Sequence, residues 1–255
     1  MVHILVTNDD GVFAPGLLAL AREMQKIARV TILAPDRNWS SSGHVKTLSR
    51  PLRVKEVLLD GGIPALASDG APSDCVAIAL LGFIKEEIDL VVSGINPVAN
   101  LGSDLTYSGT VTAVMEAMVF GKPGIAFSID GLSGPPEFDF SEPAGICRKI
   151  VSNVLEQGLP PGVLLNVNLP YLPEKEIKGY QVTRQGKRVY RDLLDARIDP
   201  MGRPYYWIGG EVPTGVPDDG TDIGALFDGY ISITPIHLDL TAHPWIDRLK
   251  DWRWG

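Results

Sequence analysis

Short apolar runs rich in β-branched residues alternate with segments of helical spacing over the first half of the chain, and this alternation limits the possible folds most. Strand-like runs occupy residues 3–7, 29–35, 89–95 and 123–129. Apolar residues at helical spacing occupy residues 16–28, 72–84 and 109–121. Strands that alternate with helices favour a mostly parallel sheet. The pattern predicts an α/β fold of three layers, Rossmann-like, with helices on both faces of the sheet.

The other elements follow a less regular pattern. Two strands are expected within 178–212, around a turn that contains Asp199, Pro200 and Gly202. Further elements are predicted at 46–58 (strands of a hairpin-like excursion), 141–158 (a helix), 162–170 (a strand) and 228–236 (a strand).

The C-terminal tail, residues 241–255, holds three of the five tryptophans. Such large side chains favour burial, so the tail is expected to pack on the body or on a partner chain. No repeat, low-complexity stretch or linker divides the sequence. We therefore expect a single domain over residues 1–255, with a C-terminal extension from about residue 178.

Composition excludes several classes of function. The net charge of −8 disfavours a partner with a nucleic-acid backbone. The N-terminus lacks the basic and apolar regions of a signal peptide, and no apolar run approaches the ~18 residues of a membrane span. Cys75 and Cys147 lie in apolar, helix-like stretches, which is typical of buried free thiols in a reducing compartment. A cytoplasmic protein that binds no membrane is expected.

Polar clusters follow the predicted strands at the edge where open α/β sheets bind ligands. Each cluster alone is a weak signal, and their shared position makes the set informative. The clusters are Asn8–Gly11, Ser40–Gly43, Asn96 and Ser108–Thr110.

Asp9 and Asp10 would point to opposite faces of an extended strand, so both reach one ion only if the chain turns at Gly11. A cation in the cleft would hold both carboxylates ionised. Hard oxygen donors without a histidine or cysteine cluster favour Mg²⁺, Mn²⁺ or Ca²⁺ over Zn²⁺. The competing interpretation of this motif is a helix cap with one extra acid. His44, alone in its loop, is more typical of a structural histidine than of a ligand.

Ser108, Gly109 and Thr110 open a predicted helix that has no acid in its first turn. Free backbone N–H groups and the helix dipole favour a phosphate there. The alternative is an ordinary serine cap. Neither a Walker P-loop nor a dinucleotide-binding glycine motif is present. A serine hydrolase is poorly supported because the sequence lacks G-x-S-x-G.

Seven segments, which span nearly the whole chain, match motifs that occur together and in this order in one family. They are ILVTNDDGVFAPG (4–16), VTILAPDRNWSSSGH (30–44), DGAPSDCVAIAL (69–80), DLVVSGINPVANLGSDLTYSGTVTAVMEA (89–117), LLNVNLP (164–170), DPMGRPYYWIGGE (199–211) and GYISITPIHLDLTA (229–242). On these motifs the sequence resembles the survival protein SurE family of 5′/3′-nucleotidases. One departure is Trp39, where members often carry a polar or charged residue.

The resemblance implies one divalent metal ion per subunit, Mg²⁺ or Mn²⁺, with Ca²⁺ as a bound but less active ion. It implies metal ligands at Asp9, Asp10, Ser40 and Asn96. It places the phosphate against Asn100, Ser108, Gly109 and Thr110. Catalytic roles then fall to Asp9, Asp10, Asn100 and Ser108.

The implied activity is metal-assisted hydrolysis of nucleoside 5′- and 3′-monophosphates, with short polyphosphate as a further substrate. A water molecule, bound to the metal or activated by Asp9 or Asp10, would attack the phosphorus in line. The resemblance also implies a homodimer or homotetramer that exchanges its C-terminal segment. Two alternatives are a non-catalytic nucleotide-binding regulatory module and a glycosyltransferase-like protein, although the D-x-D motif of the latter is not seen.

Overall fold

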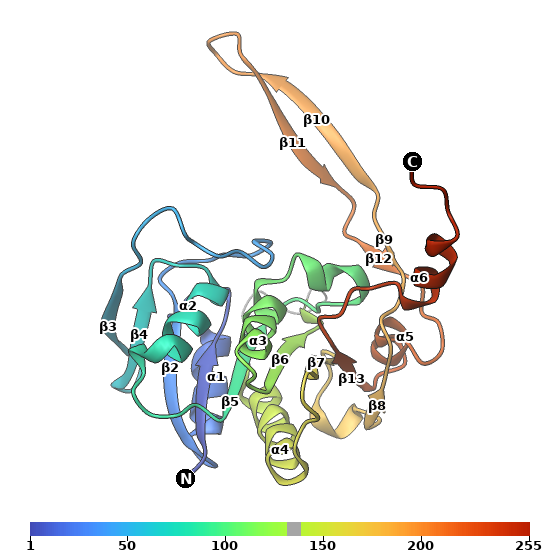
Figure 1. Cartoon of the computed structure of the whole chain (residues 1–255). Helices are drawn as coiled ribbons and strands as arrows, with labels where there is room; N and C mark the ends of the chain where they lie inside the picture. The colour runs from blue at the N-terminus through green and yellow to red at the C-terminus, as the bar shows by residue number, and fades with distance from the viewer. Residues whose placement is uncertain (132–138) are drawn as a thin grey trace.

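The computed structural model describes residues 1–131 and 139–255, and a large sheet between two layers of helices forms its body (Figure 1). The strands of this sheet are β1 (His3–Thr7), β2 (Arg29–Pro35), β3 (Val54–Leu59), β4 (Ile63–Ser68), β5 (Leu90–Asn96), β6 (Gly124–Ile129), β7 (Leu164–Leu169), β8 (Tyr180–Val182) and β13 (Ile231–Ile236). Among the described residues these nine strands follow the order β3-β4-β2-β1-β5-β6-β7-β13-β8.

The middle of the sheet, from β4 to β7, is parallel throughout. In the described part of this sheet, antiparallel pairs lie towards the edges, between β3 and β4 and between β13 and β7. The carboxyl ends of β2, β1, β5 and β6 therefore lie side by side at one edge of the sheet. This arrangement confirms the predicted mostly parallel α/β fold.

Apolar residues point alternately to two separate cores, as the two-residue period of a strand requires. Ile4 and Val6 pack in the core under α1 and α4, whereas Leu5 packs in the core under α2 and α3. Cys147 lies in the first core and Cys75 in the second, and both are free and buried, as predicted. The helices are α1 (Pro15–Met24), α2 (Pro72–Ile78), α3 (Gly109–Val119) and α4 (Ser141–Gln157).

All four predicted helices are present and begin within one residue of the predicted start, but α1 ends at Met24, four residues before its predicted end. Pro15 and Pro72 occupy the first turns of α1 and α2, where a missing N–H group costs no hydrogen bond. The helix expected over 72–84 continues past α2 as a π-helical turn, Ala79–Phe83. A short 3₁₀ helix, Gly102–Thr106, lies in the loop between β5 and α3.

The predicted hairpin is present, but only residues 54–58 of the predicted range 46–58 form a strand. The hairpin pairs β3 with β4 and covers Val54–Ser68. Its turn contains Gly61 and Gly62, both with positive φ, +83° and +75°. This Asp-Gly-Gly turn is a recognisable hairpin signal, while residues 46–53 contain Pro51 and form no strand.

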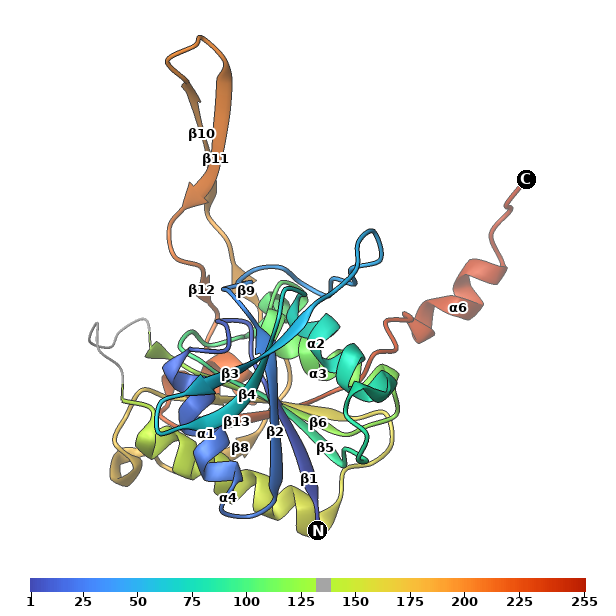
Figure 2. The same ribbon diagram turned by 90° about the vertical axis from the view of Figure 1, so that its left-hand side faces the viewer.

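A long hairpin leaves the body in the C-terminal third of the chain (Figure 2). It pairs β10 (Asp192–Ile198) with β11 (Pro204–Gly210), so the two predicted strands around Asp199–Gly202 are confirmed. At its base, β9 (Arg188–Val189) pairs with β12 (Thr214–Gly215). Two short helices that the sequence analysis missed follow, α5 (Asp222–Phe227) and α6 (His243–Lys250).

One face of the hairpin is apolar and exposed. Leu194 pairs with Ile208 and Ala196 with Tyr206 on that face. The other face is mixed, because Asp195 pairs there with Trp207 and Arg197 with Tyr205. Leu194 is 67% exposed and Ile208 82% exposed. The tail tryptophans Trp245, Trp252 and Trp254 are exposed as well, so within this chain the tail does not pack on the body.

Among the described helices, none is long and apolar enough to cross a membrane.

Candidate functional site

The loops after β1 and β2 are joined by two backbone hydrogen bonds. The N–H of Trp39 donates to the carbonyl of Asp9 at 2.7 Å, and that of Val12 donates to Pro35 at 2.7 Å. Because β1 also pairs with β5, whose last residue is Asn96, the structure brings the predicted metal ligands to the ends of three neighbouring strands. Ser40 follows Trp39 directly in this arrangement.

The loop after β1 turns at Gly11, as it must if Asp9 and Asp10 are to reach one ion. Asn8 closes the turn, since its side-chain Nδ2 donates to the Gly11 carbonyl and its Oδ1 accepts from the Gly11 N–H. Gly11 adopts φ +106°, and a Cβ there would lie 3.2 Å from the backbone of Arg37. The glycine is therefore needed both for the turn and for the close approach of the second loop.

Asp9 lies against the start of α3. Its Oδ1 accepts a hydrogen bond of 2.5 Å from the hydroxyl of Thr110, and only 4% of the residue is exposed. Burial raises the pKa of Asp9, while hydrogen bonds from Thr110 and Gly109 oppose the rise. The helix start thus stabilises the ionised carboxylate within the site.

Asp10 is the carboxylate of the site that has no counter-charge from the described part of the protein. Burial, and then the charge of Asp9, raise its pKa to about 7. Its carboxylate has no hydrogen-bond or ion-pair partner among residues 1–131 and 139–255. A metal ion fits here because it would neutralise two adjacent carboxylates that otherwise repel one another.

Asn96 and Ser40 complete a set of hard oxygen donors. Asn96 is half-buried, and its Nδ2 donates to the Val98 carbonyl at 2.5 Å, which leaves the amide oxygen as its available donor to an ion. Ser40 is exposed, in a tight turn where its N–H donates to Asn38. Within the described chain no three His, Cys, Asp or Glu side chains gather, so a metal site here depends on the mixed set. Such a set suits Mg²⁺ or Mn²⁺.

Trp39, which the resemblance predicts to depart from the family pattern, lies in the loop after β2. The guanidinium of Arg37 lies 4.8 Å above its ring. Its hydrogen bond to Asp9 uses only main-chain atoms, so the link to the Asp pair does not depend on the side chain at this position.

At the start of α3 the predicted phosphate-binding residues already have partners in the protein. The Ser108 Oγ accepts from the N–H of Val111 and so caps the helix, as the alternative interpretation proposed. The Thr110 hydroxyl is bound to Asp9. A phosphate role for these residues and for Gly109 stays a prediction.

Asn100, the remaining predicted phosphate ligand, is held by a buried polar network that the sequence analysis missed. Its N–H and carbonyl bond to the side chain of Asn168, at 2.8 and 3.0 Å, and its carbonyl also accepts from Asn166. Its Nδ2 donates to Ser128 at 2.7 Å. Two asparagines at alternate positions of the apolar strand β7 were the available signal, because they share one face.

A second missed group fastens the loop that carries Ser40. The buried carboxylate of Glu116, on α3, pairs with His44 at 2.8 Å and with Lys46 at 3.0 Å. The hydroxyl of Thr112 also donates to the Gly43 carbonyl. His44 is therefore a structural histidine, as expected, and the three residues Glu116, His44 and Lys46 form what we call the Glu116 cluster.

Comparison with known proteins decides the family. The family model described as survival protein SurE matches residues 4–192. The chain belongs to the SurE family. It is 51% identical to the 5′-nucleotidase SurE of Chloroflexus aggregans over 99% of this chain and 100% of the relative. It is 52% identical to the 5′-nucleotidase SurE of Herpetosiphon aurantiacus over 100% of this chain and 99% of that one.

A solved SurE structure has the same fold. The crystal structure of the SurE protein from Aquifex aeolicus superposes with a TM-score of 0.81 at 42% identity, covering 97% of this chain and 98% of that one. The α/β architecture predicted from the sequence is therefore the architecture of SurE.

Proposed function

We propose that the protein is a divalent-metal-dependent phosphomonoesterase that releases phosphate from nucleoside monophosphates. The observation that carries this proposal is the Asp10 carboxylate, half-buried with no partner in the described protein, beside Asp9, which lies against the start of α3. The relatives named 5′-nucleotidase SurE support the same activity. Nucleoside 5′- and 3′-monophosphates are the proposed substrates, and short polyphosphate is a further one.

The proposed metal ligands are Asp9, Asp10, Ser40 and Asn96. A bound Mg²⁺ or Mn²⁺ would supply charge neutralisation and polarise the phosphate oxygens, and Ca²⁺ would bind with lower activity. Within the protein, Thr110 orients the Asp9 carboxylate through the 2.5 Å hydrogen bond. A carboxylate fixed in this way keeps its direction throughout the reaction.

The phosphate would lie against Asn100, Ser108, Gly109 and Thr110. Asn100 is suited to bind phosphate from a fixed position, because its main-chain N–H and its carbonyl are both hydrogen-bonded to Asn168. One of Asp9 and Asp10 would take the proton from the water that attacks the phosphorus in line.

The test is phosphate release from AMP and 3′-AMP by Asp9→Asn and Asp10→Asn variants, with Mg²⁺, Mn²⁺ or a chelator present. We expect each variant to lose roughly a hundredfold or more in turnover, while circular dichroism shows a folded protein. Asp60→Asn is the matched control, because that acid is exposed in the turn between β3 and β4. Near-normal turnover of either active-site variant with added Mn²⁺ contradicts the proposal, and a wild-type protein that binds AMP without releasing phosphate would be a regulatory module.

We also propose a homodimer or homotetramer held by the C-terminal segment. The support is the apolar face of the β10–β11 hairpin and the exposed tail tryptophans, surfaces that would be buried by a second copy. The proposed location is the cytoplasm, consistent with two free thiols. The acidic charge supports an absence of nucleic-acid and membrane partners.

A further inference from the structure

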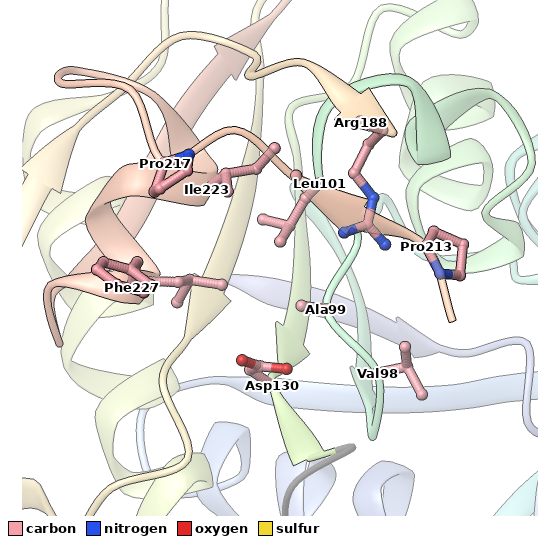
Figure 3. Close-up of a pocket in the computed structure, with 11 residues that line it drawn as sticks. Val98, Ala99, Leu101, Asp130, Arg188, Pro213, Pro217, Ile223 and Phe227 are labelled. Carbon is pink, nitrogen blue, oxygen red and sulfur yellow. The ribbon is translucent and has the colours of Figure 1, made fainter. Parts of the chain in front are cut away.

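A pocket of about 300 Å³ opens beside the loop of Asn100 (Figure 3). Its lining contains one carboxylate, Asp130, and one guanidinium, Arg188, and is mainly apolar elsewhere. Asp130 directly follows β6, and its N–H donates to the Leu169 carbonyl at 2.9 Å. The next residue, Gly131, donates to the carbonyl of Pro97. The pocket therefore lies at the same sheet edge as the Asp pair.

The order of the strands sets the distance between Asp130 and the Asp pair. Strands β1, β5 and β6 are consecutive neighbours. With adjacent strands about 4.8 Å apart, Asp130 lies roughly 10 Å along the edge from the end of β1. This separation suits a single substrate that holds its phosphate at the Asp pair and extends its nucleoside towards β6.

The chemistry of Asp130 favours neutral hydroxyl groups as its partners. The carboxylate is half-buried and has no hydrogen bond from any residue in the described ranges. The nearby Arg188 is already paired with Asp104 at 2.6 Å. An acid in this position repels phosphate and accepts hydrogen bonds from a pair of sugar hydroxyls, as carboxylates do in many nucleotide sites.

The opposite wall of the pocket suits a flat base. Leu101, Ile223 and Leu226 belong to one buried apolar cluster, and Phe227 lines the same pocket with 78% of its surface exposed. Stacking a second flat ring on an exposed aromatic ring buries the apolar surface of both rings.

The wall is rigid because Asp222 fixes α5 to the body. Its carboxylate is fully buried and accepts hydrogen bonds from the N–H groups of Gly102 and Gly186, at 2.8 and 2.7 Å. The pocket therefore exists before a ligand arrives.

We propose that this pocket binds the ribonucleoside moiety of the substrate, with Asp130 accepting hydrogen bonds from the ribose hydroxyls and Phe227 stacked on the base. The proposal rests on the proposed function, because it takes the phosphate to lie at the Asp pair. It names ribonucleotides, rather than deoxyribonucleotides or sugar phosphates, as the favoured class of substrate.

Calorimetric titration of adenosine and 2′-deoxyadenosine into the full-length protein, with a chelator present, tests the pocket without catalysis. We expect adenosine to bind more tightly than 2′-deoxyadenosine. Asp130→Asn should weaken adenosine about tenfold and nearly abolish the preference for ribose. Phe227→Ala should weaken both nucleosides and keep the preference. Controls are Asp228→Asn, an exposed acid next to the pocket, and Phe83→Ala, an exposed ring on the far helix layer.

The proposal is overturned if the wild-type protein does not bind adenosine. It is also overturned if both variants bind adenosine as tightly as the wild type does. Failure of the proposed hydrolase activity is seen in a different measurement, the release of phosphate from AMP. Adenosine binding with the expected variant pattern, together with no phosphate release from AMP, would support the pocket and reject the proposed activity. Phosphate release from AMP with no effect of either variant on adenosine binding would reject the pocket alone.

Discussion

Gly109 lies so close to Asp9 that a Cβ atom on residue 109 would sit 2.6 Å from the aspartate Cβ. No real pair of such atoms approaches that distance, so any side chain at 109 must displace either Asp9 or the start of α3. The absence of a side chain at one residue is therefore what lets a carboxylate lie against the helix start, within reach of Thr110.

The first prediction concerns that contact. Gly109→Ala should lower phosphate release from AMP about a hundredfold, because small displacements of a reacting group have effects of this size. Gly145→Ala on α4 is the matched control, since its Cβ would enter open space. It should keep full activity and gain roughly 0.5–1 kcal/mol in unfolding free energy. Equal activity of the two variants would show that the position of Asp9 does not matter.

The parts of this site that lie at strand ends could be predicted from sequence. β1 and β2 have the predicted limits, since buried parallel strands read as continuous apolar runs. The parallel pairing of β1 with β5 then places Asp9, Asp10 and Asn96 at one edge of the sheet. The partners of these residues could not be found in this way, because side chains such as Asn168 and Glu116 act across long stretches of sequence with no local periodic signal.

The C-terminal third was less predictable for a different reason. α5 has only six residues and owes its position to Asp222, which binds two distant loops. Its helical pattern is too short to stand out from the surrounding turns. α6 has no buried residue at all, so no apolar stripe against the body marks it.

A second prediction concerns the network around Asn100. Asn168→Ala removes two hydrogen bonds to the Asn100 main chain in a fully buried place. The unfolding free energy should fall by about 1–3 kcal/mol, the usual effect of leaving buried polar groups unpaired. Urea denaturation measures the change. Asn153→Ala, on the exposed side of α4, should change it by less than about 0.5 kcal/mol, and an unchanged midpoint for Asn168→Ala would contradict the role of the network.

The Glu116 cluster predicts a dependence of stability on pH. The hydrogen bond from His44, and then Lys46, hold the pKa of Glu116 below its usual value of 4.5. A carboxyl whose pKa is lower in the folded state stabilises the fold above the unfolded value and loses that contribution as the pH falls through the folded pKa. The thermal midpoint of Glu116→Gln should therefore lie below that of wild type at pH 7 and approach it below pH 4.5.

Glu156→Gln on α4 serves as the control for this experiment, because that acid is exposed and far from the loop of Ser40. Its midpoint should follow wild type at every pH. A Glu116→Gln deficit that stays constant from pH 7 to pH 3 would show that packing, and not the charge of Glu116, fastens the loop.

The proposed assembly predicts that the two faces of the hairpin respond differently to substitution. Ile208→Ser lies on the apolar face and should shift the protein towards the monomer in light scattering. Arg197→Ser, on the opposite face, should leave the mass unchanged. A monomeric wild-type protein, or the same mass for both variants, would rule out an interface on the apolar face.

The two cysteines divide between the helix layers, and burial raises the pKa of both thiols. Neither should react with a thiol reagent in the native state, since the thiolate is the reacting form. Each layer of the protein thus contains one intrinsic chemical reporter. The rates of modification of Cys75 and Cys147 in mild denaturant would reveal whether the two halves of the sandwich open together or one before the other.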